Sequence, residues 1–160
     1  MILQLLPEQV ADRWDEVGEA IAHSLPTLVD TELEGVMESI LEALIGGVMQ
    51  CWVSFQYGDD GKEVVNGIGT TAVIEDYGSR TRSLLIYSTY SVSQTVDKDW
   101  RDAFEGIVKF AESKKCTRIV TYTTNPKIIK NAGYFDGKVE AFISFDVRRF
   151  VDLINKGERI

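Results

Sequence analysis

Apolar residues near the start of the chain recur every three or four positions, which is the spacing of one face of a helix. They are Val10, Trp14, Val17, Ile21 and Leu25. Pro7 can occupy the first turn of this helix, and Pro26 interrupts it by disfavouring helical geometry at the preceding residue. A second helix follows, and Gly46 and Gly47 end it as a C-cap would. Its apolar face consists of Leu33, Val36, Met37, Ile40, Leu41 and Leu44.

From residue 48 the spacing of apolar residues changes from helical to alternating, which indicates strands. Residues 51–57, 63–75 and 82–91 predict three strands joined by short polar loops. Consecutive strands with such loops form an antiparallel meander. Gly67 and Gly69 in the second strand indicate a bulge or the close approach of another backbone.

Helices and strands alternate in the rest of the chain. Residues 98–115 predict a helix and residues 118–123 a strand, after which Asn125 and Pro126 begin a short helix. Residues 139–145 predict a last strand, and residues 150–154 are apolar enough for one docking helix. The core stripe of the long helix consists of Trp100, Phe104, Ile107, Val108 and Ala111. We expect a single domain over residues 1–154 and a flexible tail over residues 155–160.

Composition and charge narrow the function. Hydrophobic residues make up 44% of the chain and charged residues 26%, as in globular proteins. The formal net charge of −8 repels phosphate backbones and anionic lipid, so we expect no nucleic-acid or membrane partner. A protein partner or a basic substrate fits this charge better. We expect a cytoplasmic protein, because the hydrophobic runs are too short to span a bilayer and no leader pattern is present.

The two cysteines and the single histidine do not predict a metal site. Cys51 and Cys116 lie in or beside apolar segments, and His23 cannot complete a zinc site with them at ligand spacing. We therefore expect two reduced thiols and no bound metal. His23 falls in the last turn of the first helix, where a histidine interacts favourably with the helix dipole.

The order of the predicted elements, taken with one stretch of sequence, resembles the GNAT superfamily of N-acetyltransferases. The stretch comprises the strand that starts at Arg118, then Asn125, Ile128-Ile129, Gly137 and the segment from Val139. The resemblance covers residues 48–145 and implies a GNAT-like α+β fold with a splayed mixed sheet. The whole chain also resembles small GNAT-like proteins encoded by tailed phages, which implies a location in the host cytoplasm or the virion.

The GNAT resemblance implies cofactor-binding positions as well. The loop after the third meander strand would hold the pyrophosphate of acetyl-CoA, through Ser91, Ser93 and Gln94, beside Tyr87. This loop contains no glycine, and Asp97 and Asp99 place carboxylates where phosphates would lie. A capping role at the start of the next helix, for Thr95 or either aspartate, is the alternative.

Asn125 follows a strand and precedes a helix, as the residue that anchors pantetheine does in the family, although an Asn before Pro is equally a helix N-cap. The resemblance implies a tyrosine proton donor on this helix, and Tyr134 is displaced from the usual position by about half a turn. Glu75, Asp76 and Tyr87 are the candidates for a general base, and none has a spacing that singles it out.

Two functions of different classes follow from these residues. In the first, the chain is a phage-encoded GNAT-fold protein with a degenerate phosphate loop that acts mainly as a protein-interaction or virion-associated module, and it binds no cofactor or binds acetyl-CoA only weakly. The alternative is an acyl-CoA-dependent N-acyltransferase that acts on an amine of a small molecule or protein. The acidic loop predicts an acetyl-CoA dissociation constant no tighter than about 100 µM.

Overall fold

The structure is a computed structural model and describes residues 2–25, 33–91, 97–133, 136–141, 143–144 and 146–156, with residues 97–103, 127 and 131 described by their backbone alone. The chain divides into two compact units, Met1–Thr123 and Thr124–Ile160. That residues 1–154 act as one domain stays a prediction.

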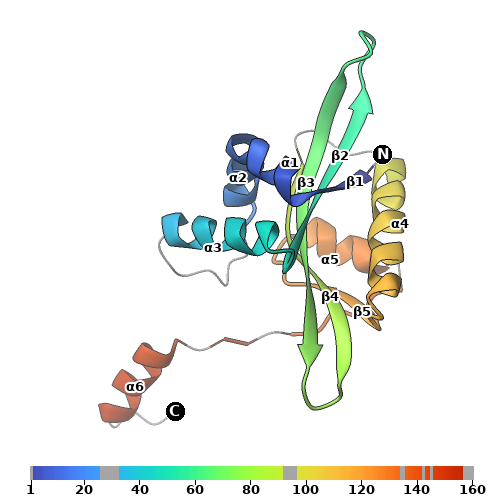
Figure 1. Cartoon of the computed structure of the whole chain (residues 1–160). Helices are drawn as coiled ribbons and strands as arrows, with labels where there is room; N and C mark the ends of the chain where they lie inside the picture. Colours follow the sequence, from blue (N-terminus) through green and yellow to red (C-terminus); the bar gives the residue numbers. More distant parts are fainter. Residues whose placement is uncertain are drawn as a thin grey trace. The chain divides into compact units, whose positions relative to one another are not determined.

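The first unit is built on a five-stranded sheet in the order β1-β2-β3-β4-β5 (Figure 1). Its strands are β1 (Ile2–Leu5), β2 (Met49–Tyr57), β3 (Glu63–Asp76), β4 (Thr81–Ser91) and β5 (Arg118–Thr121). The first four strands pair antiparallel, and β5 pairs parallel with β4. The predicted meander and the predicted mixed sheet are therefore confirmed. The short edge strand β1 was not predicted.

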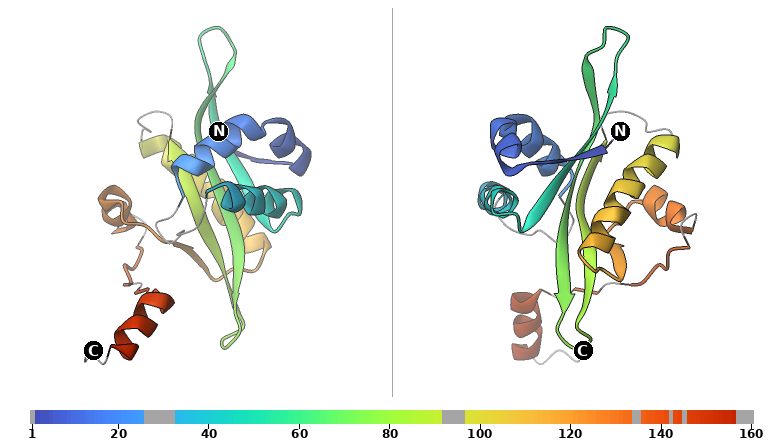
Figure 2. Two further views of the ribbon diagram at one scale, coloured as in Figure 1. Left: turned by 90° about the vertical axis from the view of Figure 1, so that its left-hand side faces the viewer. Right: turned by 45° about the vertical axis from the view of Figure 1, so that its right-hand side comes forward.

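Helices cover both faces of this sheet (Figure 2). The helices α1 (Pro7–Asp12), α2 (Trp14–His23) and α3 (Leu33–Ile45) lie on one face, and α4 (Asp97–Ser113) lies on the other. The predicted first helix is divided at Arg13, whose φ of −110° and ψ of 19° depart from helical geometry. The core between α1–α3 and the sheet consists of Val10, Val17, Ala20, Ile21, Ile40, Leu44, Cys51, Val53 and Ile68.

The apolar stripe of α4 is only partly as predicted. Ala111 is buried, Phe104 and Ile107 are half-buried, and Val108 is exposed, so the prediction of Val108 as a core residue is wrong. The side chain of Trp100 lies outside the described residues. Phe110, which the sequence did not single out, packs edge-on against Trp52 with ring centroids 5.4 Å apart. The side of α4 that contacts the sheet is therefore rotated about the helix axis relative to the predicted stripe.

The glycines of β3 mark a bulge, as predicted. The β2–β3 register passes from Ser54–Gly67 to Phe55–Val65, which leaves Asn66 as the extra residue. A Cβ atom on Gly67 would lie 2.9 Å from the main-chain oxygen of Tyr90, so β4 approaches too closely for any side chain at this position.

The second unit contains α5 (Pro126–Ala132) and α6 (Val147–Asn155). The strand expected over residues 139–145 is not formed by the described residues of that stretch, and this expectation is not met. Val139 and Ile143 are 68% and 72% exposed. A strand needs a neighbouring strand to satisfy its backbone groups, and the described residues of the second unit contain no other strand.

Within the described residues, no helix has the length and apolarity needed to cross a membrane. The same part of the chain contains no cluster of three His, Cys, Asp or Glu side chains that could hold a metal ion.

Candidate functional site

The strand β4 has two halves with different neighbours. In the described part of the chain, its parallel pairing with β5 runs from Ser83–Arg118 to Ile86–Thr121 and ends there. The strand then continues along β3 to its last residue. We call residues 83–86 the closed half of β4 and residues 87–90 the open half. The edge of the open half that points away from β3 pairs with no described strand.

A β-bulge stands at the junction of the two halves. Thr70 pairs with Ser88 and Thr71 pairs with Ile86, which leaves Tyr87 as an extra residue in β4. Such a bulge increases the local twist and changes the direction of nearby backbone and side-chain groups. The β4–β5 pairing thus ends directly before the bulge that interrupts the β3–β4 pairing.

The Tyr87 side chain is half-buried and packs against the core beneath α1–α3. Burial raises the pKa of its hydroxyl above the ordinary value of 10.0. The phenol therefore stays protonated at neutral pH and can donate a hydrogen bond or a proton. It is unsuited to the role of general base that the sequence left open.

A buried hydroxyl pair fixes the strand directly after the bulge. The Oγ1 atom of Thr70 and the Oγ atom of Ser88 lie 2.7 Å apart, and both residues are almost fully buried. Because each hydroxyl satisfies the other, this pair sets the register at which β4 resumes its pairing with β3.

The end of α2 approaches the open half of β4. The rings of His23 and Tyr90 have centroids 6.0 Å apart and are tilted by 49°. The Nδ1 atom of His23 lies 2.8 Å from the main-chain oxygen of Glu19, which can only accept a hydrogen bond. In the neutral imidazole, Nδ1 therefore carries the proton and Nε2 keeps its lone pair.

The negative charge of the chain is concentrated in the region that supplies α1–α3. Residues 1–48 contain ten Asp or Glu and one Lys or Arg, a formal charge of −9. The remaining residues hold 15 of the 25 acidic and 16 of the 17 basic side chains, a formal charge of +1. The α1–α3 face of the sheet is consequently the face that attracts cations.

No protein-family model matches this sequence, and a search of curated proteins finds no match. Solved structures do match. A probable acetyltransferase has a TM-score of 0.65 at 10% identity, over 92% of this chain and 96% of its own. The enzyme AAC(6')-Iy, in complex with a bisubstrate analogue, CoA-S-monomethyl-acetylneamine, has a TM-score of 0.63 at 13% identity, over 91% and 95%.

An aminoglycoside acetyltransferase from an uncultured soil metagenomic sample has a TM-score of 0.61 at 16% identity, over 92% of this chain and 96% of its own. Identities this low establish a common fold. The fold is that of the GNAT acetyltransferases. The resemblance drawn from the sequence is thereby confirmed at the level of the fold.

The structure places the predicted residues of this GNAT fold in different parts of the chain. Tyr87 and Ser91 both lie on β4, at the bulge and at the end of the strand. Glu75 lies opposite Arg82, five residues before Tyr87 in β4, which is a separation of roughly 16 Å along the strand. The structure therefore does not bring Glu75 to the bulge. Ser93, Gln94 and Tyr134 lie outside the described residues.

Asn125 belongs to the second unit and stands at the N-cap position of α5. Its main-chain oxygen accepts a hydrogen bond from the N–H of Ile129 at 3.1 Å. The position expected of a cap is thus observed, whereas the role of pantetheine anchor stays a prediction. Asp76 belongs to the β3–β4 turn, where the Ser79 N–H and hydroxyl donate to its carboxylate at 2.7 Å each. These bonds lower the pKa of Asp76 and give it a role in the turn.

The sequence did not predict the β4 bulge at Tyr87 or the contact between the rings of His23 and Tyr90. The consecutive apolar residues 84–87 interrupt strict alternation in β4, and this was the available signal for the bulge. No spacing in the sequence indicates that α2 ends beside β4, because that contact depends on how α2 packs on the sheet.

Proposed function

We propose that the chain is an acyl-CoA-dependent N-acyltransferase that binds its acyl thioester along the open half of β4. One observation carries this proposal: the β4–β5 ladder ends at Ile86 and Thr121, directly before the bulge at Tyr87. An exposed strand edge binds an extended ligand through main-chain hydrogen bonds. The pantetheine arm of an acyl-CoA contains two amides and can pair with such an edge.

The reaction transfers an acyl group from sulfur to nitrogen. The lone pair of a neutral amine attacks the thioester carbonyl, a C–N bond forms, and the C–S bond breaks to release a thiolate. The nitrogen loses one proton and the thiolate takes up one proton. Backbone N–H groups directed by the bulge can stabilise the oxyanion of the tetrahedral intermediate. The protonated Tyr87 hydroxyl is a candidate donor to the thiolate, and the Nε2 atom of His23 is a candidate acceptor of the amine proton.

The charge distribution supports a cationic acceptor. The acidic α1–α3 region raises the local concentration of a molecule that carries several amino groups. Two of the enzymes with this fold are the aminoglycoside acetyltransferase and AAC(6')-Iy, the latter bound to an acetylneamine analogue. A small polyamine or aminoglycoside-like amine is therefore the class of acceptor to test first.

The loop after β4 indicates weak binding of the pyrophosphate. Residues 91–96 contain no glycine, and α4 begins at Asp97 with Asp99 close behind. Each N–H bond to a phosphate is worth about 1.5–3 kcal/mol, and nearby carboxylates compete for the same donors. We expect a dissociation constant for acetyl-CoA no tighter than about 100 µM.

The test removes the bulge without disturbing the register. Deletion of Tyr87 joins the Ile86–Thr71 pair directly to the Ser88–Thr70 pair, so both flanking pairs of the β3–β4 ladder can persist. We expect transfer of acetyl groups to a polyamine, followed by release of free CoA thiol, to fall about 100-fold or more. The matched variant Tyr87→Phe keeps the bulge and should retain acetyl-CoA binding. Full activity in the deletion variant, with its fold intact by circular dichroism, would refute the proposal.

The glycine-free loop favours a second candidate function. If the phosphate contacts are lost altogether, the chain is a catalytically silent GNAT-fold module that works through a protein partner such as a virion protein. No turnover with any amine and no acetyl-CoA binding at millimolar concentration would favour this candidate over the enzyme.

A further inference from the structure

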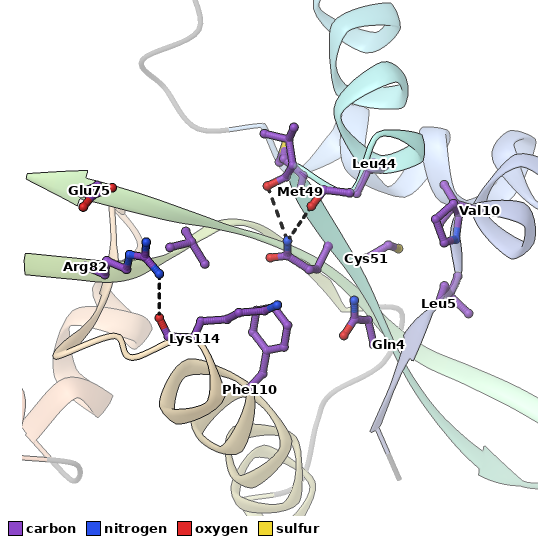
Figure 3. A pocket seen from close by; sticks show the side chains of 15 residues that line it. Gln4, Leu5, Val10, Leu44, Met49, Cys51, Glu75, Arg82, Phe110 and Lys114 are labelled. Carbon is purple, nitrogen blue, oxygen red and sulfur yellow. Dashed lines mark hydrogen bonds between the residues drawn. The ribbon is translucent and has the colours of Figure 1, made fainter.

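A cavity of about 390 Å³ lies away from the open half of β4, at the other end of that strand. Its volume falls in the range of small-molecule sites, about 300–1,000 Å³. Arg82 and Glu75, which pair across β3 and β4, form part of its wall, several residues away from the bulge. Figure 3 shows Phe110 entering from α4, Lys114 from the turn directly after it, and Gln4 and Leu5 from β1. All its lining residues belong to the first unit.

Two cations form one wall of the cavity. The guanidinium of Arg82 donates to the main-chain oxygen of Lys114 at 3.5 Å, which is a long contact. The Nζ atom of Lys114 lies 5.5 Å from the centroid of the Phe110 ring. Among the described residues, neither cation forms an ion pair. Both therefore keep donors that a ligand can occupy.

The remaining walls combine apolar side chains with the polar Gln4 and Gln50. Leu5, Val10, Leu44, Val73 and Phe110 line the cavity. The amide of Gln50, which also lies on the wall, already accepts a hydrogen bond from the Thr71 hydroxyl at 3.0 Å. Glu75 is the one carboxylate on the wall, so Arg82 and Lys114 leave the lining with a formal charge of +1.

We propose that this cavity binds a small carboxylic acid with an apolar chain. The carboxylate lies against Arg82 and Lys114, and the chain covers the Phe110 ring and the leucines. A monoanion neutralises the excess charge of the lining, and a planar guanidinium can hold a carboxylate through two hydrogen bonds. The site is separate from the open half of β4 and does not depend on acyl transfer.

The experiment is a calorimetric titration of the full chain with octanoate, repeated with octanamide, which has the same chain and no charge. We expect saturable binding of octanoate, at least five-fold tighter than that of octanamide. The double variant Arg82→Gln/Lys114→Gln should weaken octanoate binding about ten-fold. Both side chains are exposed, so the variant should fold. Glu75→Gln should strengthen binding two- to three-fold, because it removes a like charge.

The matched control is Lys109→Gln, which removes a cation of α4 that is paired with Glu105 and lies outside the cavity. It should change octanoate affinity by less than about two-fold. Three results would overturn the proposal: equal affinity for octanoate and octanamide, equal weakening by Lys109→Gln and the double variant, or no saturable octanoate binding up to about 10 mM.

Discussion

The closed and open halves of β4 share one strand and one neighbour, β3, but they differ in what the chain can do there. In the closed half, Leu84 is 0% and Leu85 is 9% exposed, and strands flank both edges. The open half follows a bulge and carries the polar residues Ser88 and Thr89 beside two tyrosines. The closed half holds the sheet together. In the open half, β3 is the one described strand that pairs with β4, and we propose that the other edge binds a ligand.

The largest expected effect lies in the closed half. Leu84→Ala should lower the free energy of unfolding by about 3–4 kcal/mol, because it leaves a cavity where a fully buried side chain was packed. The exposed open-half variant Thr89→Ala should cost less than about 0.5 kcal/mol. Urea denaturation of both variants measures the contrast. Similar losses in the two halves would mean that the comparison is wrong.

The hydroxyl pair at the junction should have an intermediate effect. Thr70→Val and Ser88→Ala each leave a buried hydroxyl without its partner, at a cost of about 1–2 kcal/mol. The double variant should lose less unfolding free energy than the sum of the two single variants, since it leaves no buried hydroxyl without a partner. A double-mutant cycle in denaturant measures this coupling. Strict additivity would show that the pair does not fix the register.

A smaller effect concerns the loop beyond the open half. Asp97→Gly combined with Asp99→Asn removes two like charges from the expected phosphate position. Acetyl-CoA affinity should rise about five-fold, which corresponds to about 1 kcal/mol. Calorimetry measures the change, and Glu112→Gln, which removes one negative charge at the far end of α4, serves as the control. An unchanged affinity would show that the loop does not meet the phosphates.

The two thiols should differ in reactivity with little effect on stability. Cys51 is buried in the core, and burial raises its pKa to about 12. Cys116 is partly exposed, and the pKa of its thiol is raised too, mainly by desolvation. At pH 8 a thiol reagent should label Cys116 in the native protein and leave Cys51 until unfolding. Mass spectrometry decides it, and equal labelling of both in the native protein would contradict the packing of Cys51.

The raised pKa of Cys51 also predicts a loss of stability in alkali. The folded pKa lies above the unfolded value, so the contribution of the buried thiol is complete below about pH 8.5 and falls as the pH rises towards 12. Cys51→Ala should remove this part of the alkaline loss, measured by urea denaturation at pH 8 and pH 10. An identical alkaline loss in the variant would contradict the burial of the thiol.

The sequence predicted the fold well where local signals agree with packing. Helix α3 ends at Gly46 and Gly47, and Gly47 adopts a φ of 73°, which suits a residue without a side chain. The meander strands fall within two residues of their predicted bounds. In each of these elements, the spacing of the apolar residues and a turn or cap residue predict the same structure. This agreement makes the element predictable without knowledge of its tertiary contacts.

The candidate site was only partly predictable. Tyr87 and Ser91 were named, but the bulge and the end of the β5 ladder depend on pairing between distant segments, which no local pattern encodes. The strand expected over residues 139–145 is an error of the opposite kind, because a local pattern is present there and the pairing is not observed. Its alternation is sufficient for a strand, but in the structure Val139 and Ile143 are exposed and no strand forms in the described part of that stretch.

The most direct test of the account is a titration of isotope-labelled protein with acetyl-CoA, followed through the backbone amide signals of β4. This measurement detects binding even at the weak affinity expected here. We predict that the signals of residues 87–90 shift and saturate together, while those of residues 83–86 move little. Shifts confined to residues 83–86, or no shifts at several times the expected dissociation constant of about 100 µM, would contradict the central claim that the open half of β4 binds the acyl thioester.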